Sequence, residues 1–312
     1  MRDGSGAAVH RPVDGAPLGR SARLPHAARH DRCMSQLTSA TEGTLLDTRP
    51  GLLRMGAART GIEVKQFFRE RDSVVFTFAF PVIMLFIFGS VFTDDVAPGV
   101  SFTQYFVAGM MASGVMLSSF QALAISIAIE RDDGTLKRLR GTPMPPAVFF
   151  LGKVGSVLVT SVLQFTILLL VAVVLFDLDL PSSVGSWARF AWVFVLGITA
   201  GTVLGIAFSS VPRSARSAGA VVSPVVIVLQ FVSGVFFVFT GMPGWMQALG
   251  SAFPLKWLAQ GMRSVFLPDS FASQEAAGSW QLPLVAGVLV LWTVVGLVLC
   301  LRTFRWMRRD AG

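Results

Sequence analysis

Six stretches of the sequence contain no Asp, Glu, Lys or Arg, and each is long enough to cross a membrane as a helix. They cover residues 73–93, 96–129, 154–176, 190–212, 217–255 and 276–301. A helix needs about 20 apolar residues to span the hydrocarbon core of a bilayer. The whole chain is 53% hydrophobic and only 14% charged, whereas a soluble domain has about 25% charged residues. We therefore expect an all-α integral membrane protein.

From these stretches we place six transmembrane helices, near 73–93, 103–129, 150–176, 190–211, 218–240 and 280–301; the third also includes the four residues before its charge-free stretch. The 217–255 stretch is longer than one helix needs, and a Gly-Met-Pro-Gly sequence interrupts it from residue 241. A seventh span over 241–268 would bury Lys256 and Arg263 with no evident partner, which is costly in lipid. We therefore expect short outer helices over 241–268, either re-entrant or resting on the membrane surface.

The segments outside the spans predict an interfacial helix and two tails. Residues 51–72 are expected to form an amphipathic helix at the membrane interface, with one apolar face made of Leu53, Ala57, Val64, Phe67 and Phe68. The transmembrane domain is expected over 73–305. Residues 1–50 show no apolar periodicity and predict a disordered cytoplasmic tail, with Met1 or Met34 as the first residue. Residues 306–312 predict a basic cytoplasmic tail.

The Lys and Arg residues predict the orientation. Eleven of them lie in one set of loops and the C-terminal tail: Arg131, Lys137, Arg138, Arg140, Lys153, Arg213, Arg216, Arg302, Arg305, Arg308 and Arg309. The opposite loops contain Arg189, Lys256 and Arg263. Because Lys and Arg concentrate on the cytoplasmic side, we expect both termini in the cytoplasm and a multi-pass protein of the plasma membrane. The net charge of +8 thus reflects topology, and we expect no nucleic-acid binding.

The positions of the histidines, and the lack of a P-loop sequence, exclude several kinds of catalytic or nucleotide-binding site. All the histidines (His10, His26 and His30) precede the apolar body, which therefore has no Ser-His-Asp triad, HExxH zinc site or histidine proton relay. Residues 147–154 are the nearest approach to a P-loop, but Ala147 replaces its first Gly and Val154 its Ser or Thr. We assign no catalytic, cofactor-binding or metal-binding residue, and we expect a protein that is not an enzyme.

One polar segment separates the second and third predicted spans. Residues 130–140 read Glu-Arg-Asp-Asp-Gly-Thr-Leu-Lys-Arg-Leu-Arg. Asp133-Gly134 is a turn signal, and 135–140 are long enough for a short helix that Gly141 and the following prolines end. Leu136 and Leu139, three residues apart, share one face of that helix. A short amphipathic helix of this kind is suited to docking in a groove of a partner.

The same segment carries a resemblance to a known family. Residues 130–140, followed by Thr142-Pro143 and Leu151-Gly152-Lys153, resemble the signature of ABC-2 type transporter permeases, and most of all the daunorubicin/doxorubicin-resistance-type efflux subgroup. The resemblance covers about residues 50–305. It implies a permease subunit that exports a drug-like compound, lipid or glycolipid, as in antibiotic efflux. The partners it implies are two ATPase subunits, which bind ATP and Mg²⁺, and a second permease, either a copy of this chain or a homologue.

The resemblance also implies which residues transmit the motion of the ATPase. Residues 135–140 are similar to a coupling helix, 52–70 to a connecting helix, and the loop from Arg213 to Arg216 to a second contact. Glu130 is expected to form an ion pair near the joint. The full predicted coupling set is Glu130, Asp133, Gly134, Thr135, Leu136, Arg138, Leu139, Arg140, Pro143, Lys153, Arg213 and Arg216.

The interior of the predicted spans leaves the substrate open. Absence of charge there disfavours a proton-coupled carrier and favours an amphiphilic or apolar substrate. Polar side chains that could line its path are Gln104, Gln121, Gln164 and Gln230, although an interhelical hydrogen bond is the favoured interpretation of each. The alternatives to an ATP-driven exporter are a membrane scaffold that transports nothing and a secondary carrier.

Overall fold

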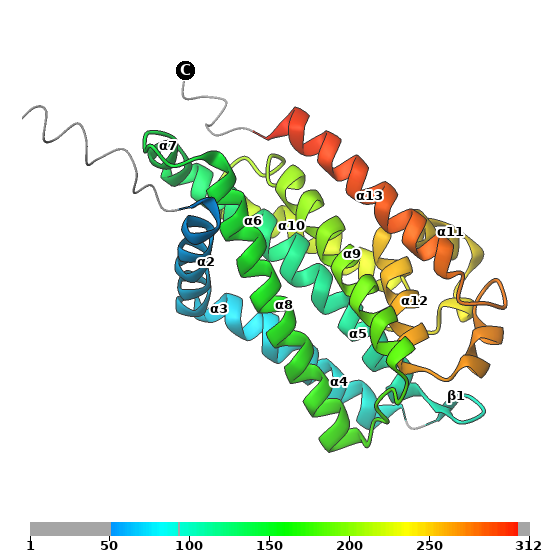
Figure 1. The fold of residues 1–312 in the computed structure, drawn as a ribbon. Coiled ribbons are helices and arrows are strands. Elements are labelled where there is room, and N and C mark those ends of the chain that lie inside the picture. The colour runs from blue at the N-terminus through cyan, green and yellow to red at the C-terminus, as the bar shows by residue number, and fades with distance from the viewer. Residues whose placement is uncertain (1–50, 93, 305–312) are drawn as a thin grey trace, which may run out of the picture. The chain divides into compact units, whose positions relative to one another are not determined.

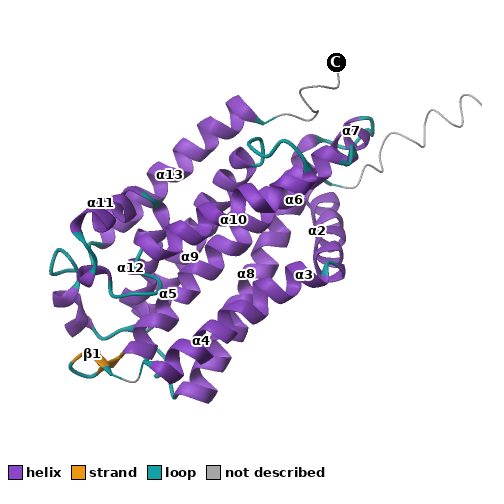
Figure 2. Cartoon of the chain, turned by 180° about the vertical axis from the view of Figure 1, so that it is seen from behind, coloured by secondary structure: helices purple, strands orange, loops and turns teal. Residues whose placement is uncertain are grey.

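The computed structural model describes residues 51–92 and 94–304 of the chain. These residues form a bundle of helices with one short β-hairpin (Figure 1). The end of the bundle that contains α7 lies opposite the end that contains β1, as Figures 1 and 2 show. The predicted tails, 1–50 and 306–312, lie outside the described residues.

The first part of the chain forms a helical arm and a hairpin. The arm consists of α2 (Leu52–Arg69), α3 (Arg71–Val74), the π-helical turn η1 (Val75–Ala79) and α4 (Phe80–Val91). The antiparallel hairpin pairs β1 (Asp95–Ala97) with β2 (Val100–Ser101). A continuous helix follows, made of α5 (Phe102–Met116), the π-helical turn η2 (Leu117–Ala122) and α6 (Leu123–Asp132).

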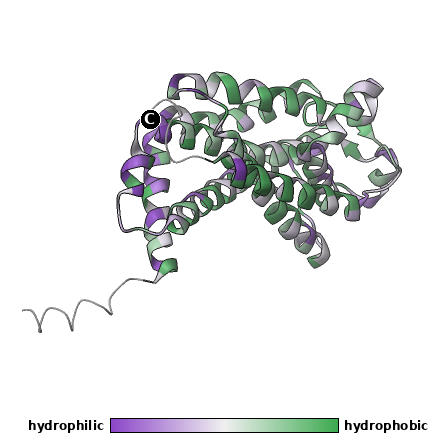
Figure 3. Ribbon diagram, turned by 90° about the horizontal axis from the view of Figure 1, so that it is seen from above, coloured by the Kyte–Doolittle hydropathy of each residue, from purple (hydrophilic) through white to green (hydrophobic). Residues whose placement is uncertain are grey.

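The second part contains the other long helices. In chain order these are the short α7 (Thr135–Arg140), α8 (Pro146–Phe176), α9 (Val184–Phe208) and α10 (Ala215–Val232). A shorter group then precedes the last helix: η3 (Phe239–Gly241), α11 (Gly244–Ala252), α12 (Pro254–Phe266), η4 (Asp269–Gln274) and α13 (Leu282–Thr303). Figure 3 shows that hydrophobic residues predominate along the long helices.

Five helices of the described residues are long and apolar enough to cross a membrane: 102–132, 146–176, 184–208, 215–232 and 282–303. They coincide with the last five predicted spans. At the first predicted span, 73–93, the apolar helix is shorter and covers Val75–Val91. The predicted end at residue 240 is wrong. The helix α10 ends at Val232, and Gly234 beyond it has φ of +72°, a left-handed conformation that an α-helix does not contain.

The helix α5–η2–α6 forms the centre of the bundle. It contacts α4, α8, α9, α10 and α12, and nearly every residue of α5 is buried. The helix α9 approaches it closely because Gly201 lies against Ser119, and Gly205 lies against the backbone of Ser119 and Phe120. The glycine pattern of α9 therefore serves close helix packing, as such patterns do in membranes.

The side of α2 that packs on the bundle is not the apolar face that the sequence predicts for this helix. The structure confirms a helix, α2, but Leu53 is 80% exposed, and the residues buried against the bundle are Gly56 and Glu63. The helix α2 packs on α8, where a side chain at Gly152 would collide with Arg59. In lipid, an apolar side chain that faces outward costs little free energy, whereas small and polar residues stabilise the protein when they form contacts between helices. The face with the small and polar residues is thus the packed one.

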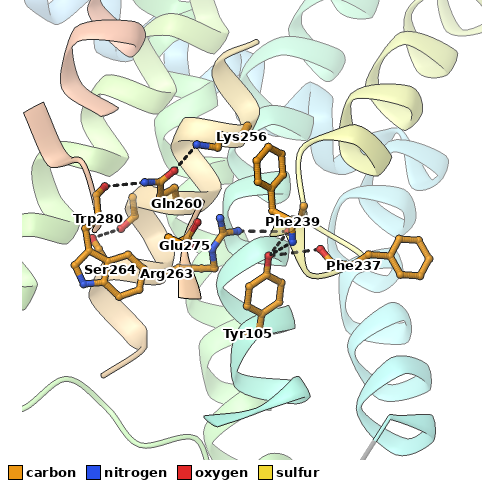
Figure 4. A network of polar contacts seen from close by, with 11 residues as sticks. Tyr105, Phe237, Phe239, Lys256, Gln260, Arg263, Ser264, Glu275 and Trp280 are labelled. Carbon is orange, nitrogen blue, oxygen red and sulfur yellow. Dashed lines mark hydrogen bonds and ion pairs between the residues drawn. The ribbon is translucent and has the colours of Figure 1, made fainter. Parts of the chain in front are cut away.

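Short helices over 241–268 are confirmed, but the cations there do have partners. Every residue of α12 is buried, including Lys256 and Arg263. The Arg263 guanidinium pairs with Glu275 at 2.6 Å, and the Lys256 ammonium donates to Gln260 Oε1 at 2.5 Å. Tyr105 donates its hydroxyl proton to Gly234 O at 3.3 Å, and Figure 4 shows these side chains converging from α5, α12 and the loops. Glu275 was not identified as a partner because it follows α12 in an irregular segment.

The buried Lys256 predicts a dependence of stability on pH. Burial lowers the pKa of Lys256 to about 8, against the opposing effect of Glu275. Between about pH 8 and 10.5 the unfolded chain therefore binds a proton that the folded chain has released, so the free energy of unfolding should rise with pH. Lys256→Met should remove this rise, and Lys65→Met, at an exposed position, should retain it. Thermal unfolding of the purified protein across this range measures both. Identical curves for wild type and Lys256→Met would contradict the assignment.

Candidate functional site

The segment between α6 and α8 forms a sharp turn followed by a short helix. Asp133 caps the C-terminal end of α6, and Gly134 has φ of +73°, which favours glycine because it has no side chain to clash. The helix α7 then runs from Thr135 to Arg140, so the predicted helix is confirmed with its predicted bounds. The turn directs α7 back against the end of the bundle, where it contacts α6.

The apolar face of α7 points into the protein itself. Leu136 is fully buried, and Leu139 is partly buried and packs against the core. Both were expected to be available for a partner, and the burial of Leu136 contradicts that exposure. The exposed surface of α7 and the residues after it is instead made of Lys137, Arg138, Arg140, Thr142 and Pro143. A partner that docks here would therefore meet cations and polar groups, with the leucines holding α7 in place.

A buried ion network lies where α2, α6 and α8 meet. The Lys153 ammonium on α8 donates to Glu130 on α6 at 2.5 Å, to Glu63 on α2 at 2.7 Å and to Ser126 at 2.9 Å. Arg59 pairs with the other oxygen of Glu63 at 2.5 Å. The side chains of Lys153, Glu63 and Glu130 are 2%, 5% and 5% exposed. The sequence indicated Glu130 and Lys153 as site residues, and the structure pairs them.

The charges of this network balance, which explains how it tolerates burial. Two carboxylates, Glu63 and Glu130, face two cations, Arg59 and Lys153. A lysine ammonium has three donors, and all three of Lys153 are used within the chain. The ring of Phe149 lies 5.6 Å from Lys153 Nζ and adds a cation–π contact. Buried charges are stable in a protein only when paired in this way.

The loop between α9 and α10 is bonded to the same end of α6. Arg131 donates to the Pro212 carbonyl at 2.9 Å, and Asp132 accepts from the Ala215 backbone N–H at 2.8 Å. A carboxylate at the first turn of a helix stabilises it through the free N–H groups and the helix dipole. The predicted second contact, Arg213 and Arg216, is exposed at this end. The structure thus places both predicted coupling segments on one surface, which we call the α7 face.

The four glutamines of the predicted substrate path lie in different environments. Gln104 forms the capping box of α5 with Ser101. Gln121 donates to Ser223 at 3.2 Å, and Gln230 donates to Ser113 at 2.7 Å. Gln164 is buried beside Gly114, and neither of its amide atoms has a hydrogen-bond partner in the described part of the chain. The structure does not gather them into one site, and a role in the substrate path stays a prediction.

Comparison with known proteins identifies the family. Residues 59–267, which include α7, the α7 face and the buried ion network, match the family described as "ABC-2 type transporter". The chain belongs to the ABC-2 type transporter family. This confirms the resemblance that the 130–153 segment indicated, and with its apolar helices it makes the chain a multi-pass permease of the plasma membrane.

Two relatives show how much of the permease is shared. The inner membrane transport permease YadH of Escherichia coli (strain K12) is 26% identical over 251 residues, which are 78% of this permease and 93% of YadH. The daunorubicin resistance ABC transporter permease protein DrrB1 of Streptomyces coeruleorubidus is 25% identical over 239 residues, which are 75% of this permease and 78% of DrrB1. ABC permeases such as these relatives work with ATPase subunits.

The ion network of the permease predicts a strongly non-additive mutant series. Lys153→Met leaves Glu63 and Glu130 buried without their shared cation and should cost about 3–5 kcal/mol of folding free energy. Adding Glu130→Gln should recover much of the loss, because Glu63 keeps its pair with Arg59 and no unpaired charge then remains. Lys137→Met, at an exposed position, is the matched control. Unfolding of the detergent-solubilised variants measures the series, and strictly additive losses would contradict a shared network.

Proposed function

We propose that the chain is the transmembrane subunit of an ATP-driven exporter of an amphiphilic or apolar compound. Its motor would be a separate ATPase, present in two copies, that binds ATP and Mg²⁺ and docks on the α7 face. A second permease, either a copy of this chain or a homologue, would complete the exporter. The observation that carries this proposal is the buried ion network directly behind an exposed, cationic helix.

The network gives the α7 face a mechanical connection to the spans. Gly134 and the buried Leu136 fix α7 to the end of α6, and Lys153 joins that end to α2 and α8. A push on α7 is therefore transmitted to three helices together rather than absorbed by a loop. ATP binding and hydrolysis in the partner would bias the bundle between two packings, as a two-state transporter requires.

The distribution of exposed charge supports the proposed orientation. We infer six spans, with Val75–Val91 as the first, and both termini in the cytoplasm. The α7 face exposes Lys137, Arg138, Arg140, Arg213 and Arg216. Loops toward the β1 end expose acidic residues: Asp94, Asp95, Asp177, Asp179 and Asp269. By the positive-inside rule, these exposed cations support a cytoplasmic α7 face, on the side where an ATPase would be available.

The substrate class rests on the interior of the spans and on one relative. Apart from the ion pair of Glu130 and Lys153, the long helices of the described residues enclose apolar side chains, hydroxyls and amides, a lining that suits an amphiphile better than a compact ion. DrrB1 is named for resistance to daunorubicin. We extend to this chain only the coarser class, an amphiphilic or apolar compound.

A matched pair of glycines tests the coupling role of α7. Gly134→Ala places a side chain at φ of +73°, whereas Gly141→Ala changes an exposed residue with φ of −77°. The strain of about 1 kcal/mol or more at residue 134 should displace α7 and lower export per ATP hydrolysed by about fivefold. Gly141→Ala should export normally. The measurement is ATP hydrolysis and uptake into inside-out vesicles that contain the permease and its ATPase.

Glu130→Gln provides a second, independent change at the joint and should also uncouple hydrolysis from export while membrane insertion persists. Normal export by both Gly134→Ala and Glu130→Gln would contradict the coupling role. A complex that hydrolyses ATP but moves none of the compounds lost by intact cells would favour the scaffold alternative instead.

Cysteine labelling tests the proposed orientation. In a chain whose own cysteines are replaced, a cysteine at Asp95 or Asp179 should react with an impermeant maleimide in intact cells. A cysteine at Lys137 should react only after permeabilisation, since it lies on the α7 face. The reversed pattern would overturn the topology.

A further inference from the structure

A cavity of about 340 Å³ lies under the interfacial helix, next to the ion network. One wall is formed by α2, α3 and η1, and the other by η2, α6 and α8. In Figure 1 the blue helix α2 stands beside the green helices α6 and α8 at this end of the bundle. The volume lies within the range of pockets that hold drug-sized ligands, about 300–1,000 Å³. We call this cavity the α2 pocket.

The lining of the α2 pocket is amphipathic. Phe67, Phe76 and Leu117 supply apolar surface, while Ser156 and Gln121 are among the polar groups. A purely apolar cavity would suit a lipid tail alone, and a purely polar one would hold only water and ions. The combination suits a molecule that has an apolar body and a polar head.

The charges around the α2 pocket favour a cationic head. The one cation that lines it in the described part of the chain is Lys153, and its three ammonium donors are taken by Glu63, Ser126 and Glu130. An anionic head would therefore find no free ammonium. The charged side chains that line the pocket are thus two carboxylates, Glu63 and Glu70, and one ammonium, Lys153, which leaves an excess of one negative charge in the lining.

Glu70 supplies the accessible carboxylate. It is exposed and follows the last residue of α2, at the edge of the pocket. An ionised carboxylate has about four acceptor positions, and within the described residues Glu70 receives one hydrogen bond, from Ser73 Oγ at 3.3 Å. The remaining positions are available to an ammonium or a similar cation, while Phe67 and Phe76 lie close enough to receive the apolar body.

We propose that the α2 pocket binds one cationic amphiphile per chain, with its charged head at Glu70 and its apolar body against the phenylalanines of α2 and η1. This deepens the proposed export function, on which it rests, by assigning a substrate class and a site within a single copy of the chain. Because Glu63 and Lys153 belong to both the pocket and the ion network, the bound molecule lies against the side chains that join α2 to α8.

The test uses the full-length permease alone, in nanodiscs of neutral phosphatidylcholine. Binding of the cationic dye rhodamine 6G is measured by fluorescence anisotropy, with the signal of empty nanodiscs subtracted, and the anionic dye 8-anilinonaphthalene-1-sulfonate is measured in parallel. The expected result is saturation at one rhodamine per chain. A stoichiometry of one per two chains would place the dye between two copies and overturn the proposal.

Two pairs of variants locate the bound dye. Ser156→Phe fills the pocket and should weaken rhodamine binding by about tenfold or more, whereas Val154→Phe on the exposed side of the same helix should bind as wild type. Glu70→Gln should weaken it by about two- to fivefold, whereas Asp179→Asn, which removes an exposed carboxylate elsewhere, should have no effect. Neither acidic substitution should change binding of the anionic dye.

The outcomes separate this proposal from the export function. Unchanged rhodamine binding in Ser156→Phe, or equal weakening by Glu70→Gln and Asp179→Asn, overturns the α2 pocket as the site. Glu70 is exposed, so its variant tests the proposal even if Ser156→Phe fails to fold. The assay contains neither ATPase nor nucleotide. Intact binding together with absent ATP-driven transport would therefore overturn the export function and leave the binding site standing.

Discussion

The ammonium group of Lys153 is the interaction on which the arrangement of the α7 end depends. It joins three helices that are distant in sequence, through Glu63 on α2 and Glu130 on α6. Each of these charges alone would be expensive to bury, and the three are tolerated because Arg59 balances the second carboxylate. Because the charges must be paired, the ion network restricts the position of α2 on the bundle. Apolar contacts would restrict it less, since apolar contact between helices contributes little free energy in lipid.

A second buried network occupies the β1 end. Arg263 pairs with Glu275, and Tyr105 binds the loop after α10 through the Gly234 carbonyl (Figure 4). Between the two networks, the interior holds neutral polar pairs such as Ser118 with Ser161 at 2.6 Å. The bundle thus places its polar contacts inside and many large apolar side chains outside, which is the distribution expected where the solvent is lipid. The same reasoning explains why α2 buries Glu63 and exposes Leu53.

In the candidate site, the sequence correctly predicted those features that depend only on neighbouring residues. Gly134 and the residues up to Gly141 define α7, because a left-handed turn and a helix end depend on neighbouring residues. They did not reveal that Leu136 faces inward, since an apolar stripe has the same pattern whether it packs on its own chain or on a partner. Glu63 was missed although it lies four residues after Arg59, because an ion pair within one helix does not indicate a third partner on another.

The sequence by itself determined the class of the protein, the approximate positions of the long helices and the extent of α7, because length, hydropathy and turn residues act locally. Only the tertiary structure decided which charges meet. Lys153 pairs with Glu63 across 90 residues of sequence. Arg263 pairs with Glu275, and both Lys256 and Arg263 are buried, although the sequence alone showed no evident partner for either cation. The α2 pocket is likewise a feature that only the tertiary structure reveals. Its walls come from helices that are separated in sequence, and the free energy of burying a charge depends on that assembled environment.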